Sequence, residues 1–140
     1  MAADAVILVD TNVLLDVVQD DPQWATWSQQ QLETAALTDP LVINAVIYSE
    51  LSVAFARIEQ LETVMSEAAL ILEDIPREAL FLAGKVFLDY RRRRGSKQRV
   101  LPDFYIGAHA AVNGYPILTR DTARYRSYFP TVRLISPLRD

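Results

Sequence analysis

Short apolar runs alternate with longer segments of helical periodicity along the chain, and this alternation limits the possible folds more than any other feature. The runs contain almost no polar residues, as expected of strands that are buried on both faces. They lie at 6–9, 41–43, 116–119 and 132–135. Strands of this kind that are joined through helices form parallel sheets. We therefore predict an α/β fold with a central parallel sheet that helices cover on both sides.

The segments between the runs repeat apolar residues at the spacing of a helix face. Helices are predicted at 11–18, after the Asp20-Asp21-Pro22 break, and at 45–58, 61–72, 77–92 and 103–112. Asn113-Gly114 forms a common helix C-cap after the last of them. The chain has no internal repeat and no Pro/Gly/Ser linker, and its 140 residues suit one core. We predict a single domain over residues 1–140.

The composition excludes several classes of metal site and of location. The chain has no cysteine and one histidine, His109, so thiolate and imidazole-rich sites are excluded. Any bound metal must be held by oxygen, which favours Mg²⁺ or Mn²⁺.

No apolar stretch is long enough to cross a bilayer. The run at 5–9 is too short for a signal peptide and follows Asp4 rather than basic residues. We expect a cytoplasmic protein with no membrane partner.

The charge is distributed unevenly along the chain. Residues 1–89 carry 15 acidic and 3 basic side chains, whereas residues 90–140 carry 11 basic and 3 acidic ones. The basic part is densest in the run from Arg91 to Arg99. Three interpretations are open: a solvated loop, a phosphate-binding segment, or a docking site for an acidic partner segment. Phosphate binding is favoured, because basic groups could offset the repulsion between acidic side chains of the same chain and a phosphate.

Four acidic residues lie at positions where they could bind a metal ion together. Asp10 closes the first apolar run, and Asp121 follows the run at 117–120. Asp103 opens a helix after Pro102, and Glu50 lies within an apolar helical stripe. Ligands of parallel sheets bind beyond the carboxyl ends of the strands, where Asp10 and Asp121 are expected. A chain that brings four carboxylates together needs a cation, and a hydrated divalent ion can activate water against a phosphodiester.

Each acid also has a purely structural interpretation. Asp10 and Asp103 are suitable helix caps, and Asp121 suits a turn. Glu50 is harder to explain in this way, because its neighbours at i±3 and i±4 are apolar and no base lies within one turn. We expect Glu50 to be buried unless it borders a cavity, and a buried carboxylate needs a partner or a cation.

Four polar residues near these acids are expected to have supporting or ordinary roles. We expect Asn12 and Asp16 to be solvated or to support the metal ligands from behind. Thr11 and Thr119 could orient a water or a phosphate, but we interpret them as ordinary turn hydroxyls.

One histidine and two tryptophans are interpreted as packing residues. His109 does not share the helix face of Asp103, so we expect it to be packed or to face a partner. Trp24 and Trp27 have helical spacing, which favours the core or an interface over base stacking.

Three segments in this order resemble PIN-domain ribonucleases, and specifically the VapC-type toxins of bacterial toxin–antitoxin pairs. The segments are Val9–Asp16, Tyr48–Leu51 and Leu101–Asp121. The resemblance covers nearly the whole chain and implies an α/β/α sandwich with a parallel sheet. It also implies Mg²⁺- or Mn²⁺-dependent endonucleolytic cleavage of RNA, leaving a 5′-phosphate.

The resemblance further implies roles for the acids and a set of partners. Asp10 and Asp103 match the principal metal ligands of the family, Glu50 its second-position acid and Asp121 its fourth. A VapB-like antitoxin is the implied protein partner, with a C-terminal tail inserted across the acidic pocket. A homodimer is also implied.

Several other functions are compatible with strand-end carboxylates. A haloacid-dehalogenase phosphatase needs an aspartate where Asn12 stands, and a receiver domain needs a lysine near a late strand end. A structure-specific DNA nuclease of the wider PIN group is another alternative, although such chains are usually longer. A non-catalytic PIN-fold module that binds RNA or a protein is the alternative from a different class. Metal-dependent activity discriminates the nuclease from this module. An α/β domain that merely has well-capped helices predicts no metal binding at all.

Overall fold

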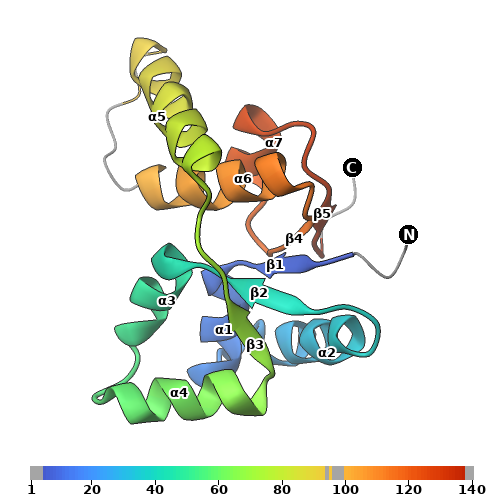
Figure 1. Ribbon diagram of the computed structural model, residues 1–140. Coiled ribbons are helices and arrows are strands. Elements are labelled where there is room, and N and C mark those ends of the chain that lie inside the picture. The colour runs from blue at the N-terminus through green and yellow to red at the C-terminus, as the bar shows by residue number, and fades with distance from the viewer. Residues whose placement is uncertain (1–4, 94, 96–99, 138–140) are drawn as a thin grey trace.

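The computed structural model describes residues 5–93, 95 and 100–137, and its centre is a sheet of five parallel strands. The spatial order is β3-β2-β1-β4-β5 (Figure 1). The strands are β1 (Ile7–Val9), β2 (Leu41–Ile43), β3 (Leu70–Leu72), β4 (Ile117–Leu118) and β5 (Leu134–Ile135). Each neighbouring pair is parallel, which confirms the predicted type of sheet.

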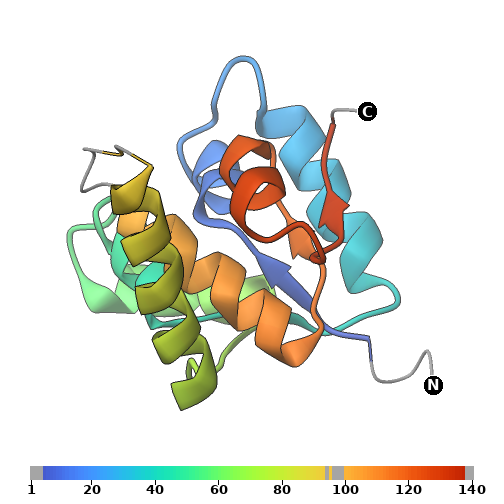
Figure 2. The same ribbon diagram turned by 90° about the horizontal axis from the view of Figure 1, so that it is seen from above.

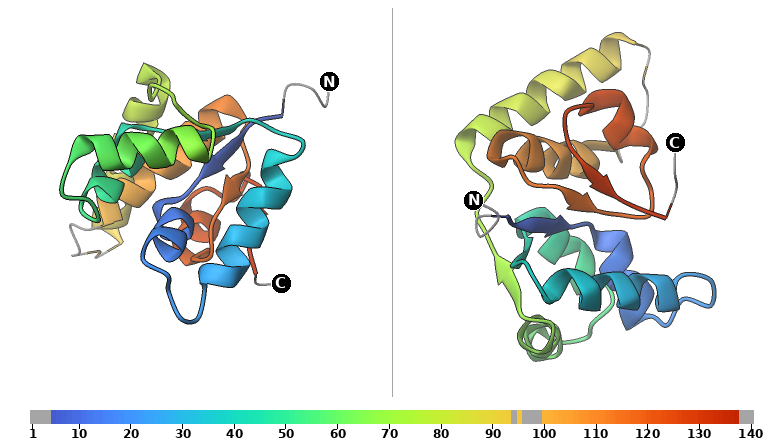
Figure 3. Two further views of the ribbon diagram at one scale, coloured as in Figure 1. Left: turned by 90° about the horizontal axis from the view of Figure 1, so that it is seen from below. Right: turned by 90° about the vertical axis from the view of Figure 1, so that its right-hand side faces the viewer.

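Helices cover both faces of the sheet. They are α1 (Thr11–Val18), α2 (Ala25–Ala36), α3 (Ala45–Ser52), α4 (Ile58–Glu67), α5 (Arg77–Arg92), α6 (Leu101–Asn113) and α7 (Ala123–Tyr128). The first four helices lie on one side of the sheet and the last three on the other (Figures 1 and 3). This arrangement confirms the α/β/α sandwich. Within the described ranges, no helix is both long and apolar enough to span a membrane.

The three central strands are buried because both of their faces are covered. Leu8 and Val9 in β1, Ile43 in β2 and Ile117 in β4 have no exposed surface. This is why these strands read as continuous apolar runs and not as alternating patterns. Because all strands are parallel, their carboxyl termini lie at the same end of the sheet, and polar residues follow the strands there. The structure therefore brings the segments that begin at Asp10 and Thr119 to the same end of the sheet.

The predicted helix at 45–58 is wrong in its second half. Helix α3 ends at Ser52, and the backbone is extended at Arg57, with φ −139° and ψ 149°. The side-chain oxygen of Gln60 accepts the backbone N–H groups of Ala56 and Arg57 at 3.0 and 3.1 Å. These contacts stabilise the start of α4 and favour a new helix over a continuous one.

The predicted helix at 61–72 is also wrong at its end, because Leu70–Leu72 form β3. The backbone of Ala69 has φ +54°, which is incompatible with a continuing α-helix. Beyond it, Leu70 pairs with Leu41 of β2. No glycine or proline separates the helix from the strand, so the sequence shows one unbroken helical pattern there.

Other predicted boundaries are confirmed with small shifts. Helix α5 has the predicted bounds, and α6 begins two residues before Asp103, with Pro102 in its first turn. Gly114 caps α6 in the left-handed conformation, with φ +70°. The basic run is described only in part, because Arg94 and residues 96–99 lie outside the described residues.

Replacing Gly107 with alanine is expected to destabilise the domain by about 1–3 kcal/mol. Helix α6 is buried at Gly107, and a Cβ there would overlap the ring of Phe129, which is itself 4% exposed. Urea unfolding measures the change. The matched control is Gly84→Ala in α5, where a Cβ would have no atom within 4 Å and should stabilise the helix slightly. Equal stability of the Gly107→Ala variant and the wild type would contradict this packing.

Candidate metal centre

Asp10 directly follows β1 at the N-terminus of α1, and its side chain is almost completely buried. Its Oδ1 accepts the N–H of Thr11 at 2.8 Å, which is the helix-capping contact. Its Oδ2 accepts hydrogen bonds from the hydroxyls of Thr119 and Tyr125, both at 2.9 Å, and from the amide of Asn12 at 3.3 Å. Oδ2 is therefore saturated, whereas Oδ1 keeps capacity for another ligand. The helix-cap and metal-ligand interpretations of Asp10 are compatible.

The surroundings of Asp10 make it easier to protonate than an aspartate in water. Burial raises the pKa of Asp10 to about 6, and the charge of Glu50 adds to this effect. The hydrogen bonds from Tyr125, Thr119 and Thr11 oppose it. The carboxylate thus has neutral donors around it that do not fully replace water.

Glu50 approaches Asp10 from α3 through the side chain of Thr11. The hydroxyl of Thr11 donates to Oε1 of Glu50 at 2.5 Å, and the N–H of the same residue donates to Asp10. Thr11 therefore links the two acids, and the interpretation of its hydroxyl as an ordinary turn group is wrong. Glu50 is half-buried, not fully buried, because the helix face around it ends at Val53, which is 86% exposed.

Asp103 lies in the first turn of α6 and is strongly affected by the other acids. Burial and the charge of Asp10 are the main causes that raise the pKa of Asp103 to about 7. The charges of Glu50 and Asp121 raise it further, and Arg124 lowers it. The guanidinium of Arg124 lies 3.6 Å from Oδ2 of Asp103. Mutual repulsion thus shows that the structure brings all four predicted acids into one electrostatic group.

Asp121 is the most peripheral of the four acids. It is exposed, and it lies in the loop between β4 and α7. Its backbone N–H donates to the hydroxyl of Thr119 at 3.1 Å, as the turn interpretation implies. The same hydroxyl donates to Asp10, so Thr119 joins two of the acids and is more than an ordinary turn residue.

The donor chemistry of this group fits a hard divalent cation. Every candidate ligand is a carboxylate oxygen, which is the donor that Mg²⁺ and Mn²⁺ prefer. In the part of the chain that the structure describes, no three His, Cys, Asp or Glu side chains are already arranged as a metal-binding group. Mg²⁺ usually keeps several waters and takes one or two carboxylates directly. The fit is therefore to a partly hydrated ion at Asp10 and Asp103, not to a cage of protein ligands.

Asp16 is buried, which excludes the expectation that its side chain is solvated and leaves the supporting role. Its two oxygens accept a bidentate pair of hydrogen bonds from Arg120 at 2.7 and 2.9 Å, and the hydroxyl of Ser28 donates to it at 2.7 Å. The same guanidinium lies 5.4 Å from the ring of Trp24. Asn12 adds a contact through Oδ1, which accepts the N–H of Arg120 at 3.2 Å. Helices α1 and α2 thus hold the loop that carries Asp121.

His109 is completely buried in the core, which confirms the expectation that it is packed. Its Nδ1 lies 3.1 Å from the amide nitrogen of Asn44, and its Nε2 lies 3.0 Å from Oε1 of Glu73. These contacts specify the tautomer in which Nε2 carries the proton and Nδ1 accepts. Trp24 and Trp27 contact each other edge to face and are half-buried, so they pack as predicted.

Tyr125 and Arg124 are site residues that sequence reasoning missed. Tyr125 is buried in α7, 115 residues from Asp10, and its phenol donates to Oδ2 of that aspartate. Nothing in the local pattern of α7 marks a tyrosine as a partner for the first strand. The only available signal was position, because α7 follows the acidic loop immediately.

Tyr125→Phe is expected to weaken the binding of Mn²⁺ by about 10–100-fold, because it removes a hydrogen bond that orients a metal ligand. The fold should persist, because Thr119 and Asn12 still donate to the same oxygen. Titration calorimetry with Mn²⁺ measures the affinity. The control is Tyr48→Phe, which removes a phenol bonded to Glu62 at the surface. Unchanged Mn²⁺ affinity in Tyr125→Phe would contradict the assignment.

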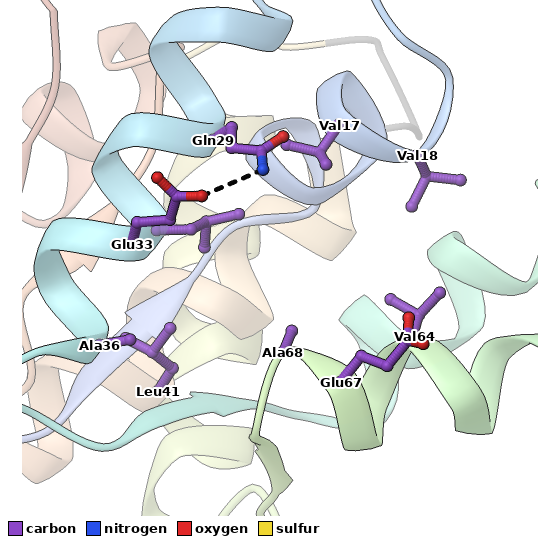
Figure 4. Close-up of a pocket in the computed structure, with 10 residues that line it drawn as sticks. Val17, Val18, Gln29, Glu33, Ala36, Leu41, Val64, Glu67 and Ala68 are labelled. Carbon is purple, nitrogen blue, oxygen red and sulfur yellow. Dashed lines mark hydrogen bonds between the residues drawn. The ribbon is translucent and has the colours of Figure 1, made fainter.

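A separate apolar groove of about 450 Å³ lies between α1, α2 and α4 (Figure 4). Its walls are Val17, Val18, Gln29, Leu32, Glu33, Ala36, Leu41, Val64, Glu67 and Ala68. Gln29 donates to Glu33 at 3.1 Å at one side of the groove. None of the four candidate acids lines it, so the groove and the candidate metal centre are different places on the molecule.

The PIN domain family model matches residues 7–129. The chain belongs to the PIN domain family. The match includes all four acids of the candidate centre, together with Thr119 and Tyr125. A search of curated proteins found no match.

Solved structures with the same fold include chains of VapBC2, of a toxin–antitoxin complex and of FitAcB. A chain of VapBC2 from Rickettsia felis, bound to a promoter DNA fragment, has a TM-score of 0.72 at 17% identity, over 94% of this PIN domain and 98% of that chain. A chain of a toxin–antitoxin complex from Klebsiella pneumoniae has a TM-score of 0.66 at 22% identity, over 96% of this PIN domain and 99% of that chain. A chain of FitAcB from Neisseria gonorrhoeae has a TM-score of 0.63 at 23% identity, over 94% of this PIN domain and 97% of that chain. At these identities the likeness establishes the fold.

Proposed function

We propose that this PIN domain is a metal-dependent endoribonuclease that acts as the VapC-type toxin of a toxin–antitoxin pair. One observation carries the proposal: the charges of Asp10, Glu50 and Asp121, from distant parts of the chain, all raise the pKa of Asp103, and Arg124 lowers it. Such repulsion destabilises a fold unless a cation relieves it. Carboxylate-held divalent ions are well suited to phosphodiester hydrolysis.

Some residues of this chain would bind the metal ion, and others orient the acids that bind it. Asp10, through Oδ1, and Asp103 would hold Mg²⁺ or Mn²⁺ directly, and Glu50 and Asp121 would hold its waters. When bound, the ion would activate water for attack on phosphorus and stabilise the charge that develops there. Tyr125, Thr119 and Asn12 orient Asp10, and Thr11 orients Glu50. Arg124, beside Asp103, would offset the negative charge of the acids when RNA approaches.

The toxin role and the protein partner are supported by the complexes in which similar folds were solved. The Klebsiella structure is a toxin–antitoxin complex, and we propose that a VapB-like antitoxin binds this chain. We also propose a homodimer. The edge strand β3 exposes half of Ile71 and Leu72, and a second copy would cover such an edge. Sedimentation equilibrium measures the mass of the assembly.

Cleavage of total RNA by the purified protein tests the nuclease proposal. We expect cleavage with Mg²⁺ or Mn²⁺ and none with excess EDTA, with restoration when metal is added back. Cleavage that survives EDTA would overturn the metal-dependent mechanism. A folded protein that binds RNA or antitoxin but cleaves none of the cellular RNAs would favour the alternative, a non-catalytic PIN-fold binding module.

A further inference from the structure

A strip of arginine and tyrosine side chains begins at the candidate metal centre and leads away from it along α7. Its first member is Arg124, whose guanidinium lies 3.6 Å from Asp103 and whose side chain is 31% exposed. Tyr128 lies four residues further on, so both side chains share one face of α7. The strip therefore starts in contact with one of the acids proposed to hold the metal.

Tyr128 connects this face of α7 to the end of α5. Its ring lies 5.2 Å from that of Phe104, the residue after Asp103, and the guanidinium carbon of Arg93 lies 5.5 Å from the same ring. Arg93 directly follows α5 and its side chain is 63% exposed. Helices α5, α6 and α7 lie on the same side of the molecule (Figure 2). Arg124, Tyr128 and Arg93 thus form one continuous strip, called here the arginine–tyrosine strip.

Both guanidinium groups have unused binding capacity. Arg93 pairs with Asp89 at 3.1 Å, but both side chains are exposed, and such pairs contribute little to stability. Arg124 meets Asp103 at 3.6 Å, which is too long for a strong hydrogen bond. A guanidinium binds phosphate oxygens through several N–H groups in one plane, and a guanidinium held over an aromatic ring offers a flat surface to a nucleobase.

We propose that the arginine–tyrosine strip binds single-stranded RNA beside the bond to be cut. This inference rests on the proposed nuclease function and deepens it, because it names the residues that would hold the RNA and its path across the surface. Cations alternating with aromatic rings are typical of surfaces that bind single strands without reading a sequence. The strip also supplies positive charge next to four acids that would otherwise repel the RNA backbone. An acidic protein segment would use the arginines but would make no use of the ring surface of Tyr128.

Fluorescence anisotropy with a labelled single-stranded RNA of about 12 nucleotides measures this binding directly. The protein is the full chain carrying Asp10→Asn, so that the probe stays intact, with Mg²⁺ present and the KCl concentration varied. Arg93→Gln and Arg124→Gln are each expected to weaken binding about threefold to tenfold and to reduce the slope of log affinity against log salt by about 0.7. The matched control is Arg77→Gln, which removes an exposed arginine at the other end of α5.

Tyr128 has its own pair of variants. Tyr128→Leu is expected to weaken the binding of single-stranded RNA about tenfold, whereas Tyr128→Phe keeps the ring and should bind like the wild type. An unfolding transition is recorded for every variant, because the ring also packs against Phe104. A purely structural role would change the transition in Tyr128→Leu without changing the RNA affinity of the protein that stays folded.

The outcomes separate this proposal from the nuclease proposal. Losses with Arg93→Gln and Arg124→Gln but not with Arg77→Gln support the strip, whatever the cleavage assay of the wild type shows. Equal affinity in all three variants overturns it, even if the wild type cleaves RNA. Binding of an acidic peptide of equal charge as tight as that of RNA overturns it in favour of a protein-docking surface, and equal binding of duplex RNA overturns the choice of single strands.

Discussion

Replacing Asp10 with asparagine is expected to lower the rate of RNA cleavage about a thousandfold while leaving the fold intact. Asp10 combines a free carboxylate oxygen with a second oxygen fixed by Thr119 and Tyr125. A bound metal contributes several kcal/mol to such reactions, and about 4 kcal/mol corresponds to a factor of about a thousand in rate. Asparagine keeps the shape and one acceptor oxygen but removes the charge. Cleavage of a defined RNA at saturating Mg²⁺ measures the rate.

The control for this variant is Asp39→Asn. Asp39 precedes β2, so it lies at the opposite edge of the sheet from the candidate metal centre. Its replacement changes the net charge by the same amount and should leave the rate unchanged. Wild-type cleavage by a folded Asp10→Asn protein would show that the site has been assigned to the wrong residues.

In the absence of divalent metal, the free energy of unfolding is expected to be higher at pH 5 than at pH 8. The pKa of Asp10 is raised from its ordinary value of 3.8 to about 6 in the folded protein, so the folded state holds the proton more tightly. The resulting penalty is absent below pH 3.8 and complete above about pH 6. A shift of about two pKa units corresponds to about 3 kcal/mol, of which about half is recovered by pH 5. Asp103 acts in the same direction up to about pH 7.

Urea unfolding in EDTA at the two pH values measures this effect, and Asp10→Asn isolates the contribution of Asp10. The difference between pH 5 and pH 8 should be smaller in the variant than in the wild type. Added Mg²⁺ should stabilise the wild type more at pH 8 than at pH 5, because the ion competes with protons for the same oxygens. An identical pH dependence in the two proteins would exclude Asp10 as its source.

The type of fold could be predicted from the sequence because burial leaves a direct pattern. Strands β1, β2 and β4 are covered on both faces, so they read as apolar runs that end in polar residues. Helix α5 has one buried face and one exposed face, and its bounds were predicted correctly. Strand β3 was missed because it is an edge strand of three residues that directly follows a helix. Its identity depends on pairing with β2, which no local pattern reveals.

The four acids of the candidate site could be predicted from the sequence, but the hydrogen bonds that position them could not. Asp10, Glu50, Asp103 and Asp121 were identified because carboxylates at strand ends and on an apolar helix face are costly without a function. Tyr125 was missed because its role depends on a hydrogen bond to a residue 115 positions away. The structure excludes the solvated alternative for Asp16, whose partner Arg120 is 104 positions away. Assignment of the four acids to a metal remains a prediction.

The place of β1 between β2 and β4 has a consequence for synthesis on the ribosome. The first strand is made at once, but one of its two neighbours is made only after residue 116, and Thr119 is 109 residues away from Asp10. A nascent chain therefore holds β1 with one bare edge until nearly all of the domain has emerged. The centre at Asp10 is completed only by the last helix, α7. A translating ribosome thus releases this domain with its candidate metal centre among the last parts to form, and a chain cut short before β4 lacks the Thr119 and Tyr125 contacts to Asp10.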